Sequence, residues 1–119
     1  MRAISFALTE RQFLDGTKDV TRRLGWKFLK PGDKLIAARK CMGLGKGGKR
    51  HDLGVIEVVS VRREPLEMML HNPDYGLEER RREGFPDMTP WHFIDFFCLS
   101  HKGCYPWTVI TRIEFRRLP

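Results

Sequence analysis

The chain has 119 residues, a net charge of +7 and a pI of about 9.7. A chain of this length can stabilise one hydrophobic core but is not readily divided into two, so we expect a single domain over residues 1–119. Hydrophobic residues at 41% and aromatic residues at 11% are enough for a packed interior, which argues against a disordered chain. The excess of positive charge favours polyanionic partners such as nucleic acid.

The sequence contains no apolar run near the roughly 18 to 20 residues that a membrane-spanning helix needs. Its start lacks the apolar core and small-residue cleavage site of a signal peptide. We therefore expect a cytoplasmic protein without membrane association. An odd number of cysteines (Cys41, Cys98 and Cys104) in such a chain favours reduced thiols over a disulfide framework.

The first elements are predicted to be a strand and a short helix. Residues 2–8 alternate small and large side chains, which indicates a strand with the larger ones inward. Thr9 and Gln12 have the spacing of a capping box, in which both side chains satisfy free N–H groups at a helix start. The helix should end near Leu14, with Gly16 as a left-handed terminator. This order places the polar residues that follow at the mouth of the sheet.

Two longer strands are predicted next, at residues 34–41 and 53–63. The first is entered through a Pro-Gly turn, and the second is β-branched and apolar on both faces for part of its length. Glycine-rich residues 43–48 join them, which suggests a long hairpin.

The glycine-rich connection also matches the spacing of a phosphate-binding loop. Arg50, however, stands where that loop needs a magnesium-binding Ser or Thr, and the segment joins two strands instead of opening a helix. We interpret it as a hairpin tip that could touch a nucleic-acid backbone through Lys46, Lys49 and Arg50.

The second half is predicted to be mainly helical. Residues 65–70 predict one or two helical turns, which residues 72–76 should break, and residues 77–83 predict a charged helix. Thr89 and Pro90 mark the start of the last helix. Its apolar stripe is expected to comprise Trp91, Ile94, Phe97 and Cys98.

Residues 108–116 alternate as a closing strand. Five or six strands with two or three short helices predict a small α+β protein, and the hairpin connections favour a mostly antiparallel, partly closed barrel.

Cys98, His101 and Cys104, with Cys41 as a fourth ligand, have the residue types of a structural zinc site. Cys98 also falls on the apolar stripe of the last helix, where a buried thiol needs no metal to explain it. We favour the second interpretation and predict neither a metal site nor a cofactor.

Basic residues accompany aromatic ones around residues 16–23. Arg22 and Arg23 are candidates for anion contacts, and Trp26 is a candidate for base stacking, as single-stranded nucleic acid requires. A solvated basic surface over core aromatics explains the same pattern equally well.

Lys18, Thr21 and Glu83 are the catalytic candidates. A threonine hydroxyl becomes a nucleophile when a base takes its proton, and a lysine serves as that base if burial or nearby cations lower its pKa. A carboxylate could orient the ligand or shuttle the proton. Residues three apart on a regular strand point to opposite faces, so Lys18 and Thr21 converge only if a turn or bulge lies near Asp19.

Residues 16–23 (GTKDVTRR), then Pro31-Gly32-Asp33, then Glu83-Gly84-Phe85 ahead of a Trp/Phe-rich helix and a final strand resemble the ASCH domain family of the PUA-like superfamily. The resemblance spans nearly the whole chain. It implies a PUA-like β-barrel with short flanking helices and a cleft that binds RNA or a nucleotide.

The resemblance also implies an alternative activity. Some small ASCH members are amidohydrolases that remove the acetyl group from acetylcytidine, and their lysine, threonine and glutamate fall on Lys18, Thr21 and Glu83. Other members are reported as ribonucleases or RNA-binding regulators. The leading hypothesis is thus an RNA- or nucleotide-binding protein, and the rival is an amidohydrolase acting on an acylated nucleoside. A ligand-free interaction module is a third possibility.

Overall fold

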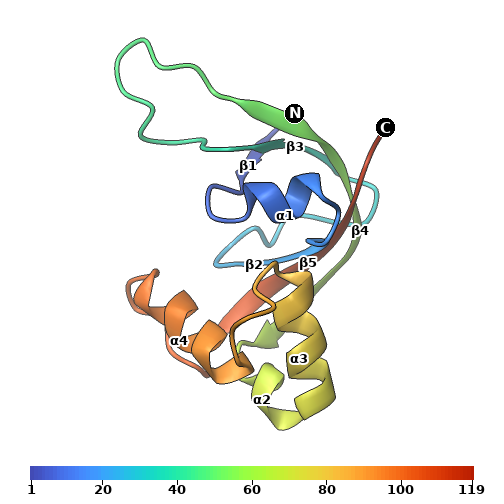
Figure 1. Ribbon diagram of the computed structural model, residues 1–119, viewed down its shortest axis with the longest axis vertical. Coiled ribbons are helices and arrows are strands. Elements are labelled where there is room, and N and C mark those ends of the chain that lie inside the picture. Colours follow the sequence, from blue (N-terminus) through green and yellow to red (C-terminus); the bar gives the residue numbers. More distant parts are fainter.

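The computed structural model describes residues 1–119. Its elements follow in the order β1 (Ala3–Ser5), α1 (Glu10–Leu14), β2 (Val20–Arg23), β3 (Lys34–Ala38), β4 (Asp52–Pro65), α2 (Met68–His71), α3 (Pro73–Arg82), α4 (Pro90–Leu99) and β5 (Val109–Arg117). Figure 1 shows α2, α3 and α4 gathered at one end of the molecule and α1 against the curved sheet above them. The long connection between β3 and β4 projects from the opposite end (Figure 1).

The five strands form one mixed sheet in the order β1-β3-β4-β5-β2. Only the pairing of β1 with β3 is parallel, and the other three pairings are antiparallel. The predicted α+β fold with short helices is therefore confirmed.

Strand pairing does not close this sheet into a barrel, because β1 and β2 remain its two edges. β1 has only three residues and pairs on one side alone. The two edges are instead bridged by a side chain, since Arg23 Nη2 donates to the Ser5 carbonyl at 2.6 Å.

Two apolar clusters hold the fold together. One lies between α1 and the sheet and includes Phe6, Phe13 and Phe115, whose rings are 5.3 to 6.2 Å apart. The other joins the helical end to β5 and includes Phe93 and Ile110. Each buried phenylalanine contributes several kcal/mol, by the roughly 3–5 kcal/mol that phenylalanine-to-alanine substitutions cost in cores.

The N-terminal predictions need two corrections. The first strand ends at Ser5, and Leu8 is 70% exposed because the chain turns away from the sheet after Phe6. The predicted capping box is absent: Thr9 precedes α1 but makes no side-chain cap. Gln12 instead donates to the Gly84 carbonyl at 3.0 Å, so a tertiary contact replaces the local one. Gly16 does adopt the predicted left-handed conformation, with φ of 82°.

The predicted helix break at residues 72–76 is confirmed only at Asn72, which is extended and separates α2 from α3, whereas residues 73–76 are already part of α3. Asn72 Oδ1 accepts hydrogen bonds from the N–H groups of Asp74 and Tyr75 at 3.1 and 3.2 Å, so Asn72 caps α3. Gly76 lies inside that helix because α3 packs closely on α2. A Cβ on Gly76 would lie 2.0 Å from the Met69 carbonyl oxygen.

The start of α4 follows the prediction, since Thr89 Oγ1 accepts from the His92 N–H at 3.0 Å. Phe93, Ile94 and Phe97 face the second cluster, whereas Trp91 is 56% exposed and does not belong to the apolar stripe. None of the helices combines the length and apolar character required to cross a bilayer.

Candidate functional site

A cavity of about 240 Å³ lies beside edge strand β2, between the segment that follows β1 and helix α4. Its polar wall, as we call it, consists of Lys18, Thr21, Arg23 and Glu83. Its aromatic wall consists of Phe6, Phe85, Phe93, Phe96 and Phe97. The cavity thus brings together all three predicted catalytic residues.

Lys18 lies just before β2, so the alternation of a regular strand does not separate it from Thr21. Its main-chain N–H donates to the Gln12 carbonyl at 3.0 Å, which anchors it at the end of α1. Its ammonium group donates to the Val20 carbonyl at 2.9 Å, to the Glu83 carbonyl at 2.6 Å and to Glu83 Oε1 at 3.3 Å. All three donors of this buried ammonium are therefore used.

Burial lowers the pKa of Lys18 to about 8, because removal from water penalises the charged form. The carboxylate of Glu83 acts in the opposite direction, and the positive charges of Arg23 and Arg22 lower the pKa further. A lysine with this pKa is partly neutral near pH 7, as a general base must be.

Glu83 is positioned by the end of α3. Gly84 has φ of 101°, its N–H donates to the Arg81 carbonyl, and the N–H of Phe85 donates to the Arg80 carbonyl. This pair of hydrogen bonds is a Schellman motif, which needs a left-handed residue and so explains the glycine. The motif turns Glu83 toward Lys18 and Phe85 into the aromatic wall.

Arg22 belongs to a buried ion-pair network and its side chain is fully buried. Its guanidinium donates to Glu83 Oε2 at 3.3 Å and to Glu79 Oε1 at 2.7 Å. Glu79 also accepts two hydrogen bonds from Arg112. The structure thus places the Arg22 side chain behind Glu83, where it orients that carboxylate.

Glu79 shows how strong this network is. Burial raises its pKa, but the hydrogen bonds from Arg112 and the charge of Arg22 outweigh burial and bring the pKa to about 2. Glu79 is therefore ionised at any physiological pH, and it neutralises part of the positive charge beneath the cavity.

Arg23 and Thr21 are adjacent on the other side of the cavity. Arg23 Nε donates to Thr21 Oγ1 at 3.0 Å, and no hydrogen bond joins that hydroxyl to Lys18 or Glu83. The convergence of the three catalytic candidates is therefore incomplete without a ligand. The Arg23 guanidinium forms no ion pair with a carboxylate and lies 5.6 Å from the Phe6 ring centroid.

The other predicted binding residues lie outside the cavity. Trp26 packs on the first core cluster and is 5.6 Å from the Phe28 ring. Lys46, Lys49 and Arg50 are exposed on the connection between β3 and β4.

The cysteines do not assemble into a metal site. The sulfurs of Cys98 and Cys104 are 3.7 Å apart, and Nδ1 of His101 lies 2.8 Å from the Phe97 carbonyl. No group of three or more His, Cys, Asp or Glu side chains is arranged to hold a metal ion. Burial raises the pKa of Cys98 to about 11, as does the neighbouring Cys104 thiol.

Sequence reasoning missed the aromatic wall and His101, whose ring stacks on Phe97 at 4.2 Å and also lines the cavity. The sequence pattern suggested a role for His101 only as a metal ligand. The sequence did contain a signal for part of the aromatic wall. The segment that forms α4 has more phenylalanines than a single buried stripe of a helix requires.

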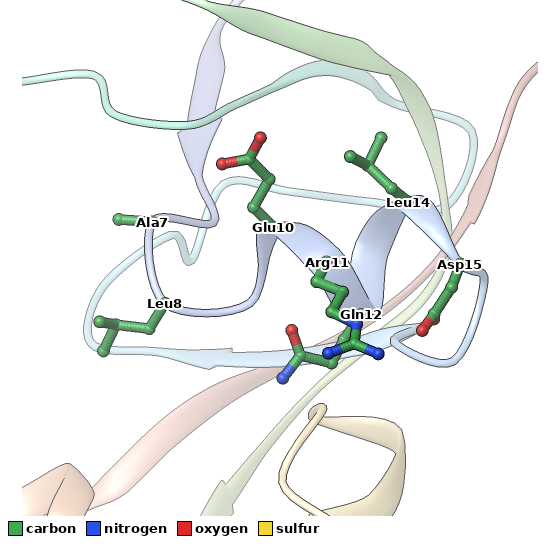
Figure 2. A pocket seen from close by; sticks show the side chains of 7 residues that line it. All are labelled: Ala7, Leu8, Glu10, Arg11, Gln12, Leu14 and Asp15. Atoms are coloured by element: carbon green, nitrogen blue, oxygen red, sulfur yellow. The ribbon is translucent and has the colours of Figure 1, made fainter.

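A second hollow of about 560 Å³ lies around α1 (Figure 2). Figure 2 shows that all seven lining residues come from residues 7–15, so one segment provides every wall. It contains no converging cluster of ionisable groups, and we regard the cavity beside β2 as the better candidate site.

No protein-family profile matches the chain, and no curated protein matches it either. Solved structures do share its fold. The hypothetical protein PH0355 superposes with a TM-score of 0.63 at 18% identity, over 98% of this chain and 96% of its own. Protein EF3133 from Enterococcus faecalis V583, described as a member of family DUF984, superposes with a TM-score of 0.54 at 16% identity, over 92% of this chain and 69% of its own. At these identities the similarity shows the fold alone.

Proposed function

We propose that the chain is an ASCH domain of the PUA-like superfamily that binds RNA or a nucleotide by taking one base into the cavity beside β2. The observation that carries this proposal is the pairing of an aromatic wall with a polar wall across a single small cavity. Aromatic rings stack on the faces of bases, and polar side chains hydrogen-bond their edges. The order of the sequence motifs and the fold shared with a DUF984 protein support the family assignment.

The size of the cavity supports a single base as the occupant. Its 240 Å³ is below the roughly 300–1,000 Å³ of pockets for drug-sized ligands. Proteins that recognise RNA by sequence commonly extract one unstacked base from a single strand. In this proposal the rest of the strand stays outside and meets the exposed cations of the β3–β4 connection, Lys46, Lys49 and Arg50.

Arg23 provides the positive charge at the cavity. Unlike Arg22, it has no carboxylate partner, so its charge remains available to an anionic ligand. The curved sheet also fits the family, because Arg23 bridges the two sheet edges that a PUA-like barrel would bring together.

Binding is tested by titrating fluorescently labelled single-stranded RNA into the protein at two salt concentrations. Affinity should fall as salt rises, through counterion release. Arg23→Ala should weaken binding at least tenfold. Arg81→Ala is the matched control, because Arg81 is exposed and pairs with Glu78 on the outer face of α3. No binding at low salt, or equal affinity of Arg23→Ala and wild type, would contradict the proposal.

A second candidate function is hydrolysis of an acylated cytidine, and the lowered pKa of Lys18 beside Glu83 specifically favours it. In this mechanism the neutral Lys18 amine takes the proton of Thr21, whose oxygen attacks the acyl carbon. Glu83, protonated through its contact with Lys18, gives a proton to the departing amine as the C–N bond breaks. Water then hydrolyses the acyl-threonine ester.

The second function is tested by incubating the protein with acetylcytidine and separating cytidine and acetate by chromatography. Thr21→Ala and Lys18→Ala should abolish turnover, and Thr17→Ala, an exposed hydroxyl nearby, should retain it. Turnover that survives both cavity substitutions would refute the assigned roles even if the chain is an enzyme.

A further inference from the structure

The main chain of Arg22 forms part of the cavity surface. The proposed binding and catalytic roles involve only side chains and do not use it. The Arg22 side chain is fully buried, at 0% exposure, whereas the whole residue keeps 2%. Arg22 nevertheless lines the cavity. What it presents there is therefore its main chain and not its guanidinium.

The register of β2 on β5 fixes where that main chain points. The N–H of Phe115 donates to the Asp19 carbonyl at 3.0 Å, so these two residues form a hydrogen-bonded pair. Bonded and non-bonded pairs alternate along an antiparallel ladder. The Arg22–Arg112 pair lies three residues further on and is therefore non-bonded. The N–H and C=O of Arg22 consequently point away from β5.

No strand lies beyond β2 to receive those groups, since β2 is an edge of the sheet. Val20 is the other residue of β2 whose main-chain groups point away from β5, and its carbonyl already accepts a hydrogen bond from the Lys18 ammonium group. The N–H and C=O of Arg22 have no such side-chain partner. Buried main-chain groups without partners are rare in proteins, and water or a ligand usually satisfies them.

A residue in this position offers a donor and an acceptor side by side, because bonded strand residues exchange both hydrogen bonds with one partner. Thr21 and Arg23 flank Arg22 and are also cavity residues, so the offered pair lies in the cavity itself. A ligand that fits must carry an adjacent acceptor and donor on one planar edge. The base-pairing edges of cytosine and uracil both have this character.

We propose that the main chain of Arg22 hydrogen-bonds the base-pairing edge of a pyrimidine held in the cavity; the inference rests on the proposed function. For cytosine, the Arg22 N–H donates to the ring N3, and the exocyclic amine donates to the Arg22 carbonyl. For uracil, the N–H donates to O4 and the ring N3–H donates to the carbonyl. The small volume favours a single-ring base over a purine.

The ligand side of the contact is tested by calorimetry with two series of nucleosides. Cytidine and uridine should bind, and their 5-methyl derivatives should bind equally well, because that methyl group lies away from the edge. N4,N4-Dimethylcytidine and 3-methyluridine, which block the edge, should bind at least tenfold more weakly. Equal binding of blocked and unblocked nucleosides would overturn the inference and leave the proposed function standing. No binding of any nucleoside or single-stranded RNA would overturn both.

The protein side is tested by replacing the Thr21–Arg22 amide with an ester, which removes the Arg22 N–H and leaves every side chain unchanged. Residues 1–40 are made by synthesis and joined to residues 41–119 by ligation at the natural Cys41. Loss of one hydrogen bond should weaken nucleoside binding about tenfold. An ester at the exposed Lys27 is the matched control and should bind normally. Wild-type affinity in the Arg22 ester, with its fold verified by circular dichroism, would overturn the inference.

Discussion

Lys18 and Glu83 contact each other twice although 65 positions separate them in the chain: the Lys18 ammonium group donates to both the main-chain carbonyl and the carboxylate of Glu83. The contact joins the segment before β2 to the end of α3. It fixes two of the three catalytic candidates before any ligand binds. The third candidate, Thr21, lines the same cavity but hydrogen-bonds Arg23 instead.

The buried charge of Lys18 should make stability depend on pH in the alkaline range. Its pKa is about 8 in the folded state and 10.5 in the unfolded chain, so between these values the unfolded chain binds more protons. The free energy of unfolding contributed by Lys18 should therefore rise with pH across this window, by up to about 3 kcal/mol.

Urea denaturation of wild type and Lys18→Met at pH 7 and pH 10 measures this effect. The free energy of unfolding of wild type minus that of Lys18→Met should be larger at pH 10 than at pH 7. The same comparison with the exposed Lys27→Met should show no shift. If the free energies of unfolding of wild type and Lys18→Met differ by the same amount at both pH values, the pKa of Lys18 is not lowered by folding.

Glu79→Gln should destabilise the protein by about 3 kcal/mol at pH 7, because it leaves the buried guanidinium groups of Arg22 and Arg112 without their shared carboxylate. The pKa of Glu79 is lowered from 4.5 to about 2, so its stabilisation is complete above pH 4.5 and is lost as the pH falls toward 2. The cost of the substitution should therefore shrink between pH 6 and pH 3 in urea titrations. Glu78→Gln on the exposed face of α3 should cost under about 1 kcal/mol. A larger cost for Glu78 than for Glu79 would contradict the network.

Gly84→Ala should destabilise the fold by about 1–2 kcal/mol. Gly84 terminates α3 in a left-handed conformation with φ of 101°, which is strained for alanine. Its Cβ would also lie 3.2 Å from both Gln12 Cβ and Thr9 Cγ2, which must move. Gly47→Ala is the control, with φ of 78° but open space around the new Cβ. Thermal melting should show the larger loss for Gly84→Ala. Equal losses would mean that the close approach of Gly84 to α1 does not add to the cost of the substitution.

The three cysteines should differ in reactivity. The pKa of Cys98 is raised to about 11, so little thiolate is present at pH 8, and Cys104 is buried. Cys41 is partly exposed and far from that pair in the sequence. Brief iodoacetamide treatment of the native protein at pH 8, followed by peptide mass spectrometry, should label Cys41 first. Equal labelling of all three in the folded state would contradict this assignment, and equal labelling in urea is the expected control.

Local sequence signals predicted the features whose physical cause is local. The Thr89 cap, the left-handed Gly16 and the strands around residues 34–41 and 53–63 follow from caps, backbone freedom and β-propensity within a few residues. The candidate site residues Lys18, Thr21 and Glu83 also followed from the sequence, because the motif resemblance named them together. The sequence did not predict how the side chains of these three residues contact one another.

Tertiary contacts decided the rest. Gln12 left its predicted capping role to bind Gly84, and Gly76 stayed inside a helix because α2 packs against it. Arg22 and Arg23 are adjacent in the sequence and chemically identical, yet one is fully buried among carboxylates and the other has none. Alternation along an edge strand sends their side chains to opposite sides, and only the fold determines what lies on each side.

Residues 16–23 were thus identifiable from sequence as a dense polar segment with a candidate chemistry. Sequence alone could not show which of these residues are buried and which line the cavity. The Arg22 side chain is buried against Glu79, whereas Lys18, Thr21 and Arg23 line the cavity. The division depends on partners about 60 positions away in α3, and the sequence pattern around residue 20 carries no information about that distance. Burial then sets the pKa of Lys18, because desolvation acts only once the chain has folded around it.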